Sequence, residues 1–160
     1  MAKERDIEGL SARMPFAEAA ALVVETRTDE LMAHSEGVLD TTEISGVHDM
    51  RVATRRLRAA LEVFAPCFPK DEHKRILKEV KAIADALGER RDRDVAIRSL
   101  TGFAAEMPAP DRPGITSLAD RFRAEQSDAN TALEPYVEPK LLERLARDLR
   151  KLTAAAREAA

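Results

Sequence analysis

The sequence predicts an all-α protein, an antiparallel bundle of about six helices. Ala, Leu, Glu and Arg, which are strong helix formers, dominate the 160 residues. Long segments repeat apolar residues every three or four positions, and no segment alternates β-branched and polar residues as a strand would. Short breaks containing proline or glycine separate these segments. Such short connections between amphipathic helices favour antiparallel neighbours.

A charged leader is predicted over residues 1–14, and one helical domain over 15–160. Pro15 suits the first position of a helix because its missing N–H is not needed there. An apolar stripe then continues to about residue 39, and the segment TTEISG ends it. A second helix is predicted over 44–64, where the two prolines of APCFP stop it.

The rest of the chain divides into four further predicted helices. The third covers 70–87 and is expected to end at Gly88, because glycine is the usual residue just after a helix C-terminus. The fourth starts near Arg90 and runs to the break MPAPDRPG. The fifth covers about 115–134, EPYVEP forms a corner, and the sixth begins near Lys140.

Positive charge is concentrated in the middle of the chain. The net charge is −3, yet residues 44–93 hold 12 basic and eight acidic side chains, and the two flanking parts are net acidic. A basic middle in an acidic chain favours a local anionic ligand over attraction of the whole surface to nucleic acid or membrane.

Several classes of protein are excluded by composition. No apolar run approaches the roughly 20 residues that span a bilayer, and the charged N-terminus does not resemble a secretory signal peptide. One cysteine cannot form an intrachain disulfide, so a cytoplasmic protein is expected. The sequence contains none of the common phosphate-loop, zinc or nucleophile motifs, and no cofactor is predicted.

A row of cationic side chains occupies one side of the second predicted helix, VHDMRVATRRLRAALEVF. At about 100° per residue, His48, Arg51, Arg55 and Arg58 share a sector of about 80°, and apolar residues lie opposite. Like charges at this spacing repel each other, and Glu62 is the acid beside them, beyond the end of the row. A chain of phosphates would relieve this repulsion, because arginine binds phosphate oxygens with two parallel hydrogen bonds. From spacing alone, a solvated helix face, a polyanion site and a catalytic site remain open.

Two further cations lie downstream. Lys81 ends a lysine row on the third predicted helix. Arg91, in GERRDRDVAI, is expected just inside a helix N-terminus, where backbone N–H groups favour anions. Asp92 and Asp94 are expected to stabilise the start of that helix and to orient arginines.

Two segments closely resemble the CHAD domain, the conserved-histidine α-helical domain. They cover residues 47–64 and 78–97, and the second contains LG followed by RDRDV. The resemblance is specific over about 15–105 and follows only the general pattern beyond. It implies an all-helical module that binds inorganic polyphosphate in a basic channel and associates with polyphosphate granules. It also implies a binding protein and not an enzyme.

The resemblance assigns polyphosphate binding to His48, Arg51, Arg55, Arg58, Lys81 and Arg91. Arg56 belongs to the same motif but turns away from the row, and we expect it to pair with an acid such as Asp92. Full CHAD domains hold two similar bundles, whereas this chain resembles one half. Two explanations stay open: a shortened chain, or a homodimer that brings two basic helices together, and we favour the homodimer.

Two other functions compete with polyphosphate binding. Binding of nucleic acid by the same row is poorly supported, because five Phe, one Tyr and no Trp offer few surfaces for base stacking. A metal-dependent phosphohydrolase would have to use His48, Asp49, Asp92 and Asp94. Neighbouring arginines would repel a metal ion there, so no metal site is predicted.

Overall fold

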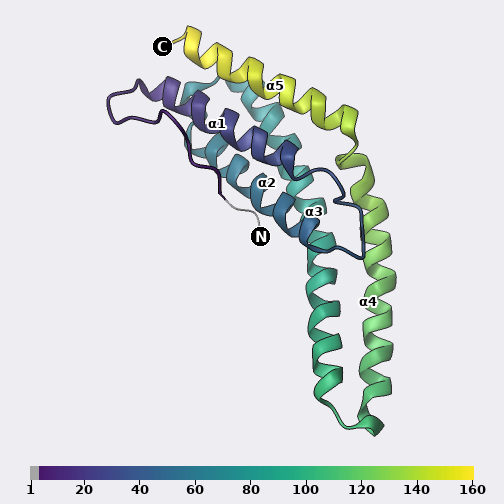
Figure 1. The fold of residues 1–160 in the computed structure, drawn as a ribbon. Helices are drawn as coiled ribbons and strands as arrows, with labels where there is room; N and C mark the ends of the chain where they lie inside the picture. The colour runs from purple at the N-terminus through teal and green to yellow at the C-terminus, as the bar shows by residue number, and fades with distance from the viewer. Residues whose placement is uncertain (1–3) are drawn as a thin grey trace.

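The computed structural model describes residues 4–160, and their regular structure is entirely helical (Figure 1). The predicted all-α class is therefore confirmed. The first three residues of the predicted leader lie outside the described part. The five α-helices are α1 Phe16–Ala33, α2 Ser45–Val63, α3 Lys70–Glu106, α4 Arg112–Leu133 and α5 Pro139–Glu158. Short 3₁₀ turns, η1 Ala65–Cys67, η2 Ala109–Asp111 and η3 Glu134–Tyr136, connect the later ones.

The helices form a bundle with a long arm. Helices α1, α2, α5 and the first part of α3 pack together, and the second part of α3 leaves this bundle with α4 beside it (Figure 1). Helix α4 packs mainly against α3, and α1 lies between α2 and α5. The arm therefore holds only two helices, and Val95, Phe103 and Leu118 are exposed on it.

The predicted count of six helices is wrong, because the third and fourth predicted helices are one. Helix α3 runs through Gly88 without a break, and among the described residues only Gly9 and Gly37 adopt positive φ. Glycine inside a helix costs about 1 kcal/mol relative to alanine. The buried side chains of Leu87, Arg90 and Asp94 on both sides of it compensate for this cost.

The first predicted helix is also too long. Helix α1 ends at Ala33, several residues before the predicted end at 39. Gly37 has a φ of 71°, which a right-handed helix does not allow. The apolar residues that extended the stripe belong to the following turn, where Val38 is buried against the core. The second, fifth and sixth predicted helices are found as α2, α4 and α5, with ends shifted by a few residues.

The core follows the predicted apolar stripes. Leucines at helical spacing on α5 face α1, and α2 buries the face opposite its arginines. Core side chains that are almost completely buried include Leu31, Met50, Leu57, Leu61, Ile76, Ile83, Leu87, Leu142, Leu145 and Leu149. Within residues 4–160, no helix combines the length and apolarity needed to cross a membrane.

Candidate functional site: a basic strip on two helices

The cationic row of α2 lies at the edge of the bundle, as its sequence pattern predicts. Met50 and Leu57 are fully buried on the opposite face. Arg55 is exposed, and His48 and Arg51 are partly covered. Helix α3, which runs antiparallel to α2 after η1, packs beside this row.

Helix α3 adds its own cations beside this row. Glu62 Oε1 accepts a hydrogen bond from Arg58 Nε at 3.1 Å and lies 3.2 Å from Lys81 Nζ. Two turns further along α3, a Cβ atom placed on Gly88 would lie 3.9 Å from Arg51 Nε. The two helices thus pack with Arg58 near Lys81 and Arg51 over Gly88. We call His48, Arg51, Arg55 and Arg58 of α2, with Lys81 and Arg91 of α3, the basic strip.

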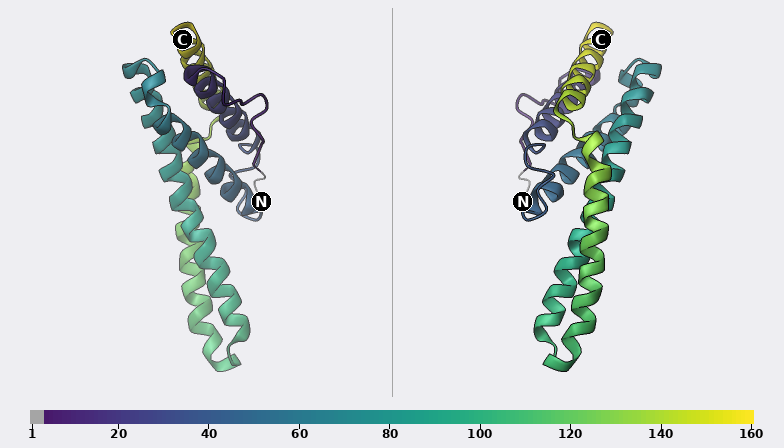
Figure 2. Two further views of the ribbon diagram at one scale, coloured as in Figure 1. Left: turned by 90° about the vertical axis from the view of Figure 1, so that its left-hand side faces the viewer. Right: turned by 90° about the vertical axis from the view of Figure 1, so that its right-hand side faces the viewer.

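The two ends of the basic strip differ. The axes of α2 and α3 lie close together near η1 and diverge toward the start of α2 (Figure 2). Arg58 and Lys81 occupy the narrow end. His48 lies one helical turn before Arg51, and Arg91 one turn after Gly88, so both lie toward the wide end. Within the described residues no hydrogen bond or ion pair joins His48 to Arg91.

Most of the arginines in the basic strip are free of acidic partners. Within residues 4–160, Arg51, Arg55 and Arg91 form no ion pair, whereas several arginines elsewhere on the bundle do. Arg75 pairs with Asp148 at 3.0 Å, and Arg157 pairs with Glu18 at 3.1 Å. Unpaired guanidinium groups from two helices on one face leave positive charge available to an external anion.

The acid at the narrow end is held in its charged form. Hydrogen bonds from Arg58 and, second, from Lys81 keep the pKa of Glu62 below its usual range. Glu62 therefore neutralises part of this end of the basic strip in the free protein. The sequence placed Glu62 beyond the end of the row, and the structure places it between the row and α3.

Arg56 has a structural role with partners other than the one predicted. Its guanidinium lies 3.8 Å from Glu30 and 3.9 Å from Glu4. Glu30 is almost fully buried and also pairs with Arg27 at 2.9 Å. The suggestion that Asp92 partners Arg56 is wrong, because Arg56 turns toward α1 and not toward α3.

The RDRD segment also differs from the prediction. Because α3 is continuous, Arg91 lies in the middle of a helix and has no free backbone N–H groups beside it. Asp92 is exposed and Asp94 is buried, so the two acids do not share a role. Asp94 Oδ1 accepts a hydrogen bond from Arg90 Nε at 3.1 Å, and both side chains are fully buried.

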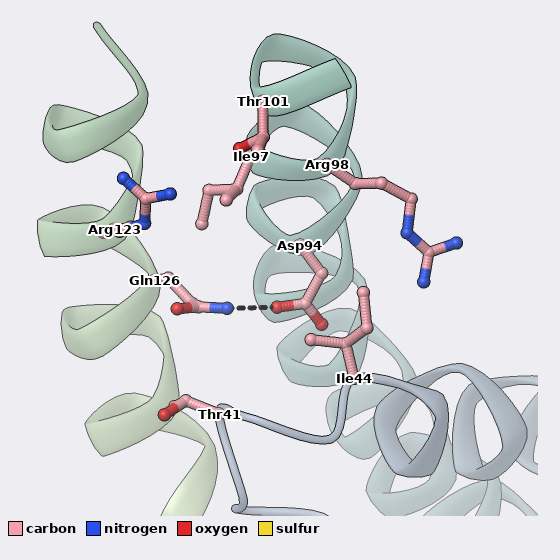
Figure 3. A pocket seen from close by; sticks show the side chains of 8 residues that line it. All are labelled: Thr41, Ile44, Asp94, Ile97, Arg98, Thr101, Arg123 and Gln126. Atoms are coloured by element: carbon pink, nitrogen blue, oxygen red, sulfur yellow. Dashed lines mark hydrogen bonds between the residues drawn. The ribbon is translucent and has the colours of Figure 1, made fainter. Parts of the chain in front are cut away.

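This buried pair fixes the arm to the bundle. Arg90 also donates to Asn130 Oδ1 on α4 at 2.5 Å, and Asn130 Nδ2 donates to the Leu39 carbonyl at 3.0 Å. Gln126 Nε2 donates to Asp94 Oδ1 at 2.6 Å, as Figure 3 shows. Helices α3 and α4 and the segment before α2 are thereby held in one arrangement.

A hollow of about 450 Å³ lies beside this network, where α3, α4 and the segment before α2 meet. Asp94 and Gln126 form part of its wall, and Arg98 points away from α4 (Figure 3), whereas Arg123 pairs with Asp120 on its own helix at 2.7 Å. Arg98 lies two turns after Arg91 on α3. The hollow therefore adjoins the wide end of the basic strip.

A metal centre is not apparent in the described residues. The residues weighed for one, His48, Asp49, Asp92 and Asp94, do not come together, because Asp94 is buried beside Arg90 and Asp92 is exposed. Within residues 4–160, no group of three or more His, Cys, Asp or Glu side chains is arranged to hold a metal ion.

Sequence reasoning missed two features of this region. The bridge formed by Glu62 needs the pairing of α2 with α3, which the sequence does not give. The Arg90–Asp94 pair has a signal in its spacing of four residues, which places both side chains on one helix face. That signal was hidden by the expectation of a helix start near Arg90.

The comparisons with known proteins identify the family. No curated protein and no solved structure matches the chain. The model of the CHAD domain family matches residues 22–160, which include all of α2 to α5 and most of α1. This match covers most of the chain and contains both motifs that carry the basic strip. The chain therefore belongs to the CHAD domain family.

Proposed function

We propose that this protein binds inorganic polyphosphate along the basic strip and does not act as an enzyme. The observation that carries the proposal is the set of arginines Arg51, Arg55 and Arg91, which form no ion pair within residues 4–160. The CHAD family is associated with polyphosphate binding, which fits a linear row of free guanidinium groups. Binding of this kind needs no nucleophile or general base.

The alternative is a module for other polyanions, including nucleic acid. Phosphate contacts by arginine would serve both ligands equally. The basic strip contains no Phe, Tyr or Trp, and Phe64 at the end of α2 packs against Phe16 of α1 with ring centroids 5.1 Å apart. Single-stranded nucleic acid relies on stacking of bases on aromatic rings, so polyphosphate is the better match.

A calorimetric titration tests the proposal. Long-chain polyphosphate and single-stranded DNA are titrated into the protein at matched phosphate concentration and salt. We expect tighter binding of polyphosphate, with an affinity that falls steeply as salt increases. Equal affinity for DNA would favour the general polyanion module, and release of orthophosphate from the polymer would favour an enzyme.

We further propose that two copies of the chain pair to bring two basic strips together. One strip leaves the bound polymer exposed on its other side, and twofold symmetry would cover it. The two-helix arm with its exposed Val95, Phe103 and Leu118 offers apolar surface for such pairing. Light scattering of the protein with and without polyphosphate should give the mass of a dimer. In the cell we expect the protein in the cytoplasm, on polyphosphate granules.

A further inference from the structure

Glu62 lies inside the basic strip and contacts two of its cations. It follows Arg58 by one turn on α2, and its Oε1 atom lies 3.1 Å from Arg58 Nε and 3.2 Å from Lys81 Nζ. One carboxylate oxygen therefore serves a guanidinium from one helix and an ammonium from the next. Both cations are residues that the family resemblance assigns to polyphosphate.

A phosphate oxygen that contacted both Arg58 and Lys81 would have to take the place of this carboxylate oxygen. A phosphate oxygen carries the same charge and accepts the same two hydrogen bonds. The lowered pKa of Glu62 means that the group is a carboxylate, and not a neutral acid, near neutral pH. The free protein thus already holds an anion between Arg58 and Lys81.

This pairing is not required for the packing of α2 against α3. The three side chains are similarly exposed, with 42% for Arg58, 43% for Glu62 and 41% for Lys81. Ion pairs as exposed as these contribute little to stability. The two helices are held together by fully buried residues, among them Leu57, Leu61 and Val80.

We propose that Glu62 is an affinity-determining residue of the basic strip, an internal carboxylate that competes with phosphate for Arg58 and Lys81. The inference rests on the proposed polyphosphate function and deepens it. Polyphosphate reaches the free arginines at once, but it gains Arg58 and Lys81 only by displacing Glu62. Loss of the Glu62 charge therefore increases affinity, whereas loss of a binding residue decreases it.

Glu79 supplies a matched control. Its two carboxylate oxygens lie 2.8 Å from Arg75 Nη1 and 2.9 Å from Arg144 Nη2. It is thus a second bridge between two cations of two helices, this time α3 and α5, with a side chain that is 26% exposed, and it lies on the side of α3 that faces α5. Glu79→Gln changes the net charge by the same amount as Glu62→Gln. It therefore shows how much the affinity for polyphosphate changes from the net charge alone.

The experiment is a titration of wild-type protein, Glu62→Gln and Glu79→Gln with long-chain polyphosphate at two salt concentrations. We expect Glu62→Gln to bind about three- to tenfold tighter than Glu79→Gln. Its affinity should also fall more steeply with salt, because more phosphates are engaged. Thermal melting of both variants verifies that the fold is kept.

The outcomes separate this inference from the proposed function. Binding by the wild type, with equal or weaker binding by Glu62→Gln than by Glu79→Gln, overturns the inference and leaves the proposed function intact. Weaker binding in particular would mean that Glu62 orients Arg58 and Lys81 for the ligand. Failure of all three proteins to bind polyphosphate overturns both. Binding by Glu62→Gln alone supports the inference about Glu62 and overturns the proposed function of the wild-type protein.

Discussion

Neighbouring arginines in this protein have opposite roles. Arg55 forms no ion pair with any residue from 4 to 160, and Arg56 is tied to the buried Glu30. In the same way Arg91 has no ion-pair partner in the described part of the chain, and Arg90 is fully buried beside Asp94. Adjacent helical residues point about 100° apart, so a pair of arginines can supply one structural and one binding group.

The buried member of the second pair should matter for stability. Asp94→Ala removes the partner of a guanidinium that has no access to solvent. Breaking a buried ion pair by removing one partner costs about 3–5 kcal/mol, and we expect a loss in this range. The free energy of unfolding by urea measures it.

Asp92→Ala is the control, because Asp92 is exposed on the same turn of α3. We expect it to change the free energy of unfolding by no more than about 0.5 kcal/mol. Equal effects of the two substitutions would show that the Arg90–Asp94 pair does not stabilise the junction of the arm and the bundle.

Helix α3 is the element that determines where the cations of the basic strip lie. Because the helix continues through Gly88, Lys81 and Arg91 belong to one rigid rod opposite α2. If the helix broke at Gly88, the direction of the segment after Gly88 would depend only on the contacts of that segment. The continuity of α3 therefore fixes the two cations relative to each other.

Substitution of Gly88 tests this continuity. In a helical position, Gly88→Ala should stabilise the protein by about 0.4–1 kcal/mol, because alanine has less backbone entropy to lose. The new Cβ would meet Arg51 Nε at 3.9 Å, an ordinary contact. Thermal and urea denaturation measure the change.

Gly37→Ala gives the opposite control. Gly37 has a φ of 71° and no neighbouring atom within 4 Å of an added Cβ, so only backbone strain should act. We expect this variant to be less stable than the wild type. A loss of stability in Gly88→Ala as well would contradict a continuous α3.

Features that depend on the local sequence could be predicted, whereas features that depend on contacts between distant segments could not. The stripes of α2 and α5 and the face of the arginines depend on helical periodicity alone, and they are found as predicted. Gly88 was misread because a glycine after an apolar run has the same local signature at a helix end and inside a helix. The buried Arg90 network, which decides between the two, involves Asn130 and residues before α2.

The partners of Glu62 and Arg56 could not be predicted from the sequence either, because they lie on other helices. Both are pairings between helices, with α3 for Glu62 and with α1 for Arg56. Periodicity gives the direction of a side chain from its own helix but not the neighbour it meets. The acid that partners a cation therefore could not be chosen from the sequence.

At the scale of the whole molecule, the distribution of charge leaves a cationic surface on one side of the bundle. Many basic residues elsewhere on the bundle are paired with acids, such as Arg157 with Glu18 and Arg75 with Asp148. The basic strip retains its free arginines at the edge where α2 and α3 meet. A chain with a net charge of −3 can thus present a local cationic surface.

The most direct test of this account is a calorimetric titration of Arg51→Ala/Arg55→Ala with long-chain polyphosphate. The control is Arg121→Ala/Arg147→Ala, which removes two exposed arginines that form no ion pair within residues 4–160 and lie outside the basic strip. Hydrogen bonds to charged groups contribute about 1.5–3 kcal/mol each, so we expect the first variant to lose about a hundredfold or more in affinity. The control should stay within a few-fold of the wild type. Equal losses in the two double variants would contradict a binding site on the basic strip.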